Sequence, residues 1–116
     1  MEESIKRALD KLNKKYNFNI PIRIVDGVNA STQPGWIQIG KDNPTELLEV
    51  IVMHEAYHII FNIDQTEEFK QKDKCNPHPY FKSEIIIWNK IKEDFPELTP
   101  FVDKAIGLEK EALGIK

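Results

Sequence analysis

The sequence predicts an α+β domain in which a small antiparallel sheet packs on helices. Two observations predict this class. Apolar residues recur at helical spacing over several stretches of the chain, and two short stretches in its first third suit strands. With 116 residues, the chain is long enough for one domain with a modest core.

The first 40 residues predict one helix followed by two strands. Residues 2–15 place their apolar side chains on one face of a helix that is charged on the other. Residues 18–25 alternate apolar and polar side chains, which predicts a strand with one buried face. Pro21 lacks a backbone donor and suits an edge or a strand start. A second strand is expected at residues 36–39, pairing antiparallel with the first across a polar loop.

The most apolar stretch, residues 47–61, predicts a helix that is buried on nearly all sides. Its start resembles a capped helix, with Asn43 as the N-cap and Pro44 as the first helical residue. Glu46 stands at the capping-box position. This helix is expected to lie at the centre of the domain.

The second half of the chain predicts two more long helices. Residues 80–94 place Phe81, Ile85, Trp88 and Ile91 on one face, and Pro96 ends that helix. A last helix starts at Thr99-Pro100, with apolar residues in register from Phe101 to Ala112, and Gly114 can terminate it. A short helix is also conceivable at residues 66–72, within a polar stretch.

The central helix contains His54-Glu55-Ala56-Tyr57-His58, an H-E-x-x-H motif. Residues four apart share one face of a helix, so His54 and His58 can bind one metal ion together. Two neutral imidazoles suit Zn²⁺. Glu55 lies one step round the helix, where it can reach a water molecule and act as a general base. The alternative is a pair of histidines without a ligand, which a buried helix disfavours because unpaired polar groups there cost free energy.

A catalytic zinc site usually has a third protein ligand, and the sequence leaves several candidates. Glu84 leads, because a carboxylate beside an apolar run on a packed helix is costly unless it is paired. Asp64 follows the motif more closely, but Phe61 stands where a glycine would make the turn. His78 is a further candidate. Cys75 lies three residues before it, but a buried inert thiol is the better interpretation of that residue.

These residues resemble the gluzincin group of zinc metallopeptidases, in which H-E-x-x-H is joined by a downstream glutamate. The short chain resembles the minigluzincins, very short soluble members of that group from thermophilic prokaryotes. The resemblance implies a zincin-like minimal catalytic domain around the motif helix and zinc metalloendopeptidase activity. It implies zinc ligation by His54, His58 and Glu84, with Glu55 as the general base. One departure is Trp88, because larger gluzincins often carry an acidic residue four positions after the ligand glutamate.

The resemblance also implies how the substrate binds and how the activity is controlled. A peptide or protein substrate would lie along an edge strand. The residues of that strand would be Trp36, Ile37, Gln38 and Ile39. Residues 1–95 would form the catalytic domain, and residues 96–116 a C-terminal helical segment that keeps a zymogen latent. The acidic residues of that segment that could approach the metal are Asp103, Glu109 and Glu111. Exchange of this helix between two chains would give a homodimer.

Composition excludes several other classes of function. The net charge is −3 with both signs interspersed, so no basic patch indicates nucleic-acid binding. No apolar run is long enough for a membrane span. The single cysteine excludes an internal disulfide and predicts a cytoplasmic protein. The many Lys and Glu residues would fit a heat-adapted protein.

Two questions stay open at the level of sequence. A non-enzymatic metal-binding interaction module is the alternative function, and Glu55 argues against it, because a structural zinc site needs no general base. The group that stabilises the tetrahedral intermediate is also open, with Tyr80 and His78 as candidates.

Overall fold

The computed structural model describes residues 2–33, 35–61 and 78–115, and these residues form a compact α+β fold with four α-helices and a three-stranded sheet. The α+β class is therefore confirmed. The elements in chain order are α1 (Glu2–Tyr16), β1 (Ile22–Val25), β2 (Ala30–Gln33), β3 (Trp36–Gly40), the 3₁₀ helix η1 (Thr45–Leu47), α2 (Leu48–Ile60), α4 (His78–Asp94), the 3₁₀ helix η3 (Pro96–Leu98) and α5 (Thr99–Ala112). None of the helices in the described ranges combines the length and apolar character that crossing a bilayer requires.

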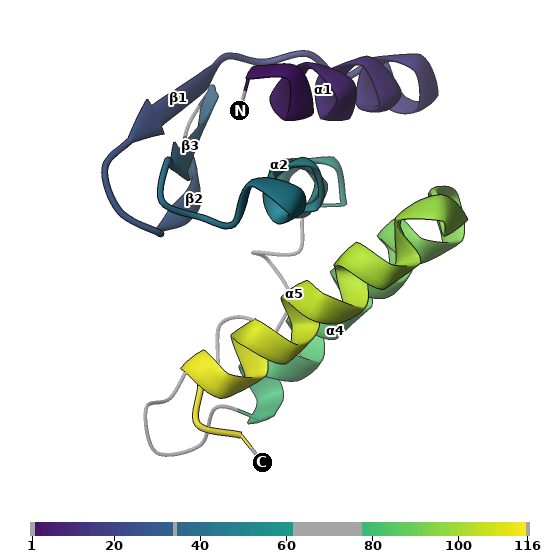
Figure 1. The fold of residues 1–116 in the computed structure, drawn as a ribbon. Helices are drawn as coiled ribbons and strands as arrows, with labels where there is room; N and C mark the ends of the chain where they lie inside the picture. The colour runs from purple at the N-terminus through teal and green to yellow at the C-terminus, as the bar shows by residue number, and fades with distance from the viewer. Residues whose placement is uncertain (1, 34, 62–77, 116) are drawn as a thin grey trace.

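Helix α2 lies at the centre of the fold. Figure 1 shows α1 and the sheet near one side of α2, and α4 and α5 running side by side on the other. Ten of the thirteen residues of α2 are buried, including positions on all sides of the helix. The prediction of a helix buried nearly all round is therefore confirmed, and every other layer of the domain packs on it.

The sheet is mixed, not antiparallel as predicted. Its strand order is β1-β3-β2, with β1 parallel and β2 antiparallel to β3. Residues 30–33, which the sequence placed in a loop, form the additional strand β2. The chain therefore reverses twice between β1 and β3, the second time at the tight turn that contains Gly35 with φ 81°. Two reversals return β3 to the direction of β1. Pro21 does precede a strand start, as expected, and its carbonyl accepts a hydrogen bond from the Ile37 amide.

The start of α2 also differs from the prediction. Asn43 does not cap the helix, because its side-chain amide donates to the carbonyl oxygen of Gly40 at 2.7 Å, in the turn that ends β3. The chain then enters α2 through η1, whose N-cap is Pro44 and which has no side-chain cap. The α-helix begins only at Leu48. The capping-box prediction is wrong because the turn after β3 uses the Asn43 side chain first.

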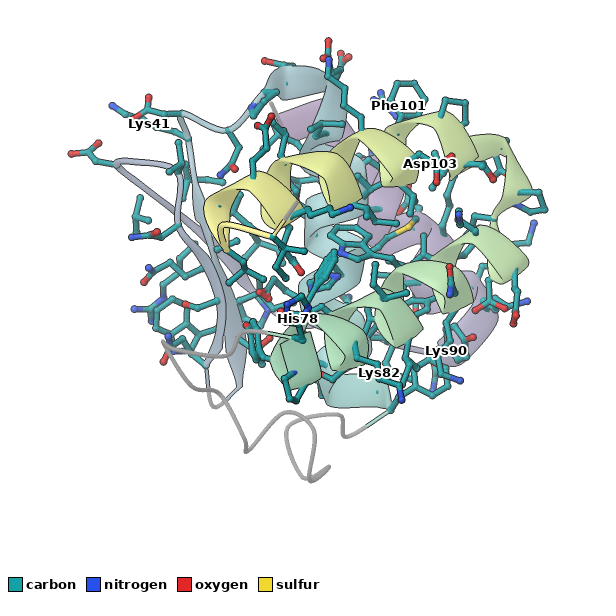
Figure 2. All side chains as sticks on the ribbon, turned by 90° about the horizontal axis from the view of Figure 1, so that it is seen from below. Lys41, His78, Lys82, Lys90, Phe101 and Asp103 are labelled. Carbon is teal, nitrogen blue, oxygen red and sulfur yellow. The ribbon has the colours of Figure 1, made fainter. Side chains whose placement is uncertain are left out.

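Helix α5 is attached to the body by few buried residues. Only Val102 and Ala105 are buried among its fourteen positions. Phe101 and Leu108, which the sequence placed on the packed stripe, are 39% and 44% exposed. Figure 2 shows the Phe101 side chain on the outer side of α5. Gly114, with φ 71°, ends the helix as predicted.

A partly buried polar cluster joins α1, α2 and the end of α4. The Asp94 carboxylate accepts hydrogen bonds from the hydroxyl groups of Tyr16 and Tyr57, the latter at 2.6 Å. Burial and the hydrogen bond to Asp94 raise the pKa of Tyr16 to about 12 and raise that of Tyr57 as well, so both phenols keep their protons and donate. Tyr57 belongs to the H-E-x-x-H motif, so this cluster fixes the motif helix against α4.

Replacing Asp94 should therefore destabilise the protein. We expect Asp94→Ala to lower the free energy of unfolding by about 2–3 kcal/mol, because it leaves the buried Tyr57 hydroxyl without its charged acceptor. Urea denaturation in the presence of a chelator measures this change. Asp103→Ala is the control, since Asp103 forms an exposed ion pair with Lys92 and should cost less than about 1 kcal/mol. Equal losses in the two variants would contradict the assignment.

Candidate metal centre

Three side chains from two helices converge beside the core. His54 and His58 come from successive turns of α2, and Glu84 comes from the second turn of α4. The Nε2 atoms of His54 and His58 lie 2.7 and 3.1 Å from Oε2 of Glu84 and 3.3 Å from each other. All three residues are buried, with 6%, 7% and 4% of their surface exposed. The structure thus brings together the three predicted ligands.

The spacing of these atoms fits a metal ion. Around a tetrahedral zinc ion, with ligand distances of about 2.0–2.1 Å, neighbouring ligand atoms are roughly 3.3–3.4 Å apart. The 3.3 Å between the two imidazole nitrogens matches that edge. The carboxylate oxygen lies closer, at hydrogen-bond distances of 2.7 and 3.1 Å from the two nitrogens. Among the described residues, this is the only group of three His, Cys, Asp or Glu side chains that could hold a metal ion. The residues present therefore fit a divalent cation.

The Glu84 carboxylate is held in its ionised form. Burial alone would raise the pKa of Glu84, but hydrogen bonds from His54 and His58 outweigh it and hold this pKa well below its usual range. A carboxylate must be ionised to bind a metal, so the two histidines prepare Glu84 for that role.

A cavity of about 730 Å³ opens beside these side chains, lined by residues of β2, η1, α2, α4 and α5. Glu55, the predicted general base, lines this cavity together with the three candidate ligands and is 8% exposed. Thr32 of β2 donates its hydroxyl to the carbonyl oxygen of Glu55 at 2.9 Å. This bond ties the sheet to the motif helix beside the site. The cavity size lies within the about 300–1,000 Å³ that small-molecule sites usually occupy.

The other candidate ligands do not join this group. His78 begins α4, is exposed, and does not line the cavity. Figure 2 shows it at the start of that helix. Asp64 and Cys75 lie outside the described residues, as do residues 66–72, where the sequence left a short helix open. Tyr80 does line the cavity, and burial, followed by the charge on Glu84, raises its pKa, so it stays protonated.

The prediction that Trp36, Ile37, Gln38 and Ile39 form an edge strand is wrong. These residues belong to β3, which pairs with β1 on one side and with β2 on the other. Ile37 and Ile39 are fully buried. A peptide cannot add to β3, because both of its edges are already paired. The edge strand beside the cavity is β2, which contributes Ala30, Ser31 and Thr32 to the cavity wall.

Of the three acidic residues in the C-terminal segment, only Glu109 lines the cavity. Asp103 and Glu111 are exposed. Burial and the charge on Glu84 raise the pKa of Glu109 to about 7, although His54 and the indole of Trp88 act in the opposite direction. Its Oε1 atom is buried without a hydrogen-bond partner among the described residues. The sequence pattern did not distinguish among the three acidic residues, so it could not predict that Glu109 is the one that faces the cavity.

The sequence also missed a contact between Trp88 and His54. Trp88 was expected to pack on the core face of its helix, and it is buried. Its ring also stacks on the imidazole of His54, with centroids 4.0 Å apart and planes inclined by 30°. The four-residue spacing from Glu84 was the available indication, because it places Trp88 on the face of α4 that carries the carboxylate.

Comparison of the chain with models of protein families, with curated proteins and with solved structures finds no match. The fold and the site therefore define the class on their own. This is an α+β protein with a buried group of two histidines and a glutamate that could hold a metal ion.

Removing the carboxylate should abolish tight metal binding. We expect Glu84→Ala to weaken zinc binding by more than about 100-fold, since even losing a group that only supports a ligand costs about 10–100-fold. Competition with a chromogenic chelator measures the affinity. Glu93→Ala removes an exposed carboxylate from the same helix and should leave the affinity unchanged. Retained zinc affinity in Glu84→Ala would remove Glu84 from the ligand set.

Proposed function

We propose that this protein is a zinc-dependent metalloendopeptidase. The observation that carries the proposal is that His54, His58 and Glu84 converge in the wall of a cavity that Glu55 also lines. Three protein donors and a neighbouring carboxylate are the parts of a catalytic zinc site, whereas a structural site has four protein donors and needs no base. The resemblance of these four residues to the minigluzincins supports the same function. The single cysteine fits a reducing compartment, so we propose a cytoplasmic location.

Each residue has a defined role in this proposal. His54, His58 and Glu84 would hold the zinc ion. When bound, zinc supplies Lewis-acid chemistry, which makes water acidic near neutral pH and polarises a carbonyl group. Glu55 accepts the proton of the attacking water as its oxygen bonds to the peptide carbon. Glu55 then delivers that proton to the amide nitrogen as the C–N bond breaks. The second proton of the water passes from the new carboxyl group to the amine, so the products are a carboxylate and an ammonium group. Tyr80, a protonated donor in the cavity wall, is our candidate for stabilising the negative charge that develops on the carbonyl oxygen.

The substrate would be a peptide or a protein segment in extended conformation. Because β3 is paired on both edges, we propose β2 as the strand along which the substrate lies. The bond from Thr32 to the Glu55 carbonyl holds β2 at a fixed position relative to the general base. Main-chain hydrogen bonds between the substrate and β2 would hold the scissile bond beside the candidate metal centre.

Changing the base should separate binding from chemistry. We expect Glu55→Gln to keep zinc affinity within a few-fold of wild type while cleavage of a denatured protein such as casein falls by about 10²–10⁴-fold, the usual contribution of a general base. The same digestion assay on Glu93→Gln should give the wild-type rate. Undiminished cleavage by Glu55→Gln would remove Glu55 from the mechanism.

We further propose that the isolated chain is a latent zymogen, blocked by residues 96–116. Helix α5 supplies four residues to the cavity wall, and Glu109 is the acidic residue among them. A carboxylate with one buried oxygen that has no partner among the described residues is a suitable fourth donor for a cation held by the α2 and α4 residues. Helix α5 would then stand where the substrate must bind. Exchange of α5 between two copies of the chain would give a latent homodimer with the same contacts.

Releasing Glu109 should raise activity. We expect both Glu109→Ala and a chain that ends at Glu97 to cleave casein at least several-fold faster than the full chain, because each frees the fourth position. Circular dichroism checks that each variant is folded. Analytical ultracentrifugation shows whether the full chain is a dimer and whether the truncated chain is a monomer. Glu111→Ala, at an exposed position of α5, is the matched control. Folded but inactive variants would contradict latency.

Glu109 also supports the alternative function. Four protein donors, two of them carboxylates, would make a closed site, which is typical of a metal that stabilises a fold. The protein would then be a non-enzymatic metal-binding interaction module. The Glu109→Ala variant separates the two, because a latent peptidase gains activity when the fourth donor is lost, whereas a structural site only loses metal affinity and stability.

A further inference from the structure

The imidazole of His54 lacks the support that metal-binding histidines usually have. Its Nε2 faces Glu84 and His58. Its other nitrogen, Nδ1, is buried and has no hydrogen-bond partner in the part of the chain that the structure describes. In most metal sites that second nitrogen donates to a carboxylate or a carbonyl, which fixes the orientation of the ring. Another contact must therefore fix the plane of the His54 ring.

The stacked indole of Trp88 makes that contact. The two ring centroids are 4.0 Å apart with planes inclined by 30°, and Trp88 and His54 are 4% and 6% exposed. Trp88 lies one turn beyond Glu84 on α4. The helix that brings the carboxylate to the site therefore also brings the flat surface against the imidazole. A ring that rests on a buried indole cannot rotate out of that plane without opening a void, which a packed interior resists.

We propose that Trp88 is a positioning residue for the metal centre, acting through His54 by stacking and not by hydrogen bonding. The inference rests on the proposed metal site and goes beyond it, since it assigns a role to a side chain that offers no ligand atom. The indole holds the imidazole of His54 in one orientation. In that orientation Nε2 faces the same position as the Nε2 of His58 and the Oε2 of Glu84, which is the proposed metal position. An aromatic ring at position 88 is therefore required, whereas apolar bulk alone is not sufficient.

The test compares an aromatic with a flexible apolar replacement. Trp88→Phe keeps a ring, and Trp88→Met fills space without one. Ile91→Ala is the control, because Ile91 is fully buried one turn further along α4 and belongs to the core, not to the cavity wall. Zinc affinity is measured by chelator competition under conditions where circular dichroism shows each variant folded. The absorption bands of bound Co²⁺ report the ligand geometry.

We expect Trp88→Met to weaken zinc binding by about 10–100-fold, the usual cost of losing a supporting group, and to alter the Co²⁺ bands. Trp88→Phe should stay within about threefold of wild type, and Ile91→Ala should lose stability with unchanged affinity and unchanged bands. Wild-type affinity in Trp88→Met, or an equal loss in Ile91→Ala, would overturn the proposal. Absence of zinc binding by the wild-type chain would instead overturn the proposed function.

A measurement on the unmodified protein keeps the proposal testable where Trp88→Met does not fold. Stacking on an indole shifts the ring-proton resonances of His54 upfield in the proton NMR spectrum. We expect the upfield shift in the wild-type protein both with and without zinc. In Trp88→Phe, which keeps a smaller ring, we expect a reduced upfield shift. His54 ring protons without an upfield shift in wild type would show that the two rings do not stack, and the proposal would fail.

Discussion

The rest of the structure depends on one constraint, which is that two imidazoles and a carboxylate must share a small buried volume. Removing a charged carboxylate from water is expensive unless a partner compensates it. Here Glu84 is compensated by two histidines that both approach the same oxygen. The arrangement requires α2 and α4 to keep a fixed register, and the Tyr57–Asp94 hydrogen bond fixes that register at the far end of α4. A cation between the three groups would satisfy all of them at once.

Prediction from the sequence succeeded where one residue spacing, or the free-energy cost of burying one charge, determines which side chains come together. Helical geometry places His54 and His58 on one face in any structure that keeps the helix. The cost of burying Glu84 required a partner, and the histidines provide it. Strand β2 could not be predicted in the same way. Its residues, Ala30 to Gln33, are all half-buried and show no alternation of apolar and polar side chains. Its pairing depends on tertiary contacts, such as Thr32 with the Glu55 carbonyl. Without β2, residues 36–39 had one predicted partner strand, so the edge strand that the resemblance implies was placed there.

Helix α5 and the candidate metal centre are energetically linked. Glu84 and Glu109 are two carboxylates beside one cavity, and the charge on Glu84 contributes to the raised pKa of Glu109. Without a cation, an ionised Glu109 is repelled, and α5 has only two buried residues with which to offset that repulsion. With a cation at the site, the carboxylate of Glu109 would instead be attracted to the positive charge. A metal that binds the docked arrangement more tightly than the open one must therefore stabilise the docking of α5 by the same free energy. The linkage holds whether the segment blocks a peptidase or closes a structural site.

The stack of Trp88 on His54 has a consequence for the chemistry that such a site can supply. A supporting carboxylate fixes the ring of a metal-binding histidine and also raises its basicity, so the ligand donates more electron density. An indole face fixes the ring without adding negative charge beside it. Once Glu109 is displaced, Glu84 would be the one anionic ligand, and a divalent ion would keep more of its positive charge than in a site where a carboxylate supports the ring of His54. More positive charge favours acidifying water and polarising a carbonyl, which are the two effects that peptide hydrolysis requires. An aromatic ring at position 88 is therefore compatible with the hydrolytic site that we propose.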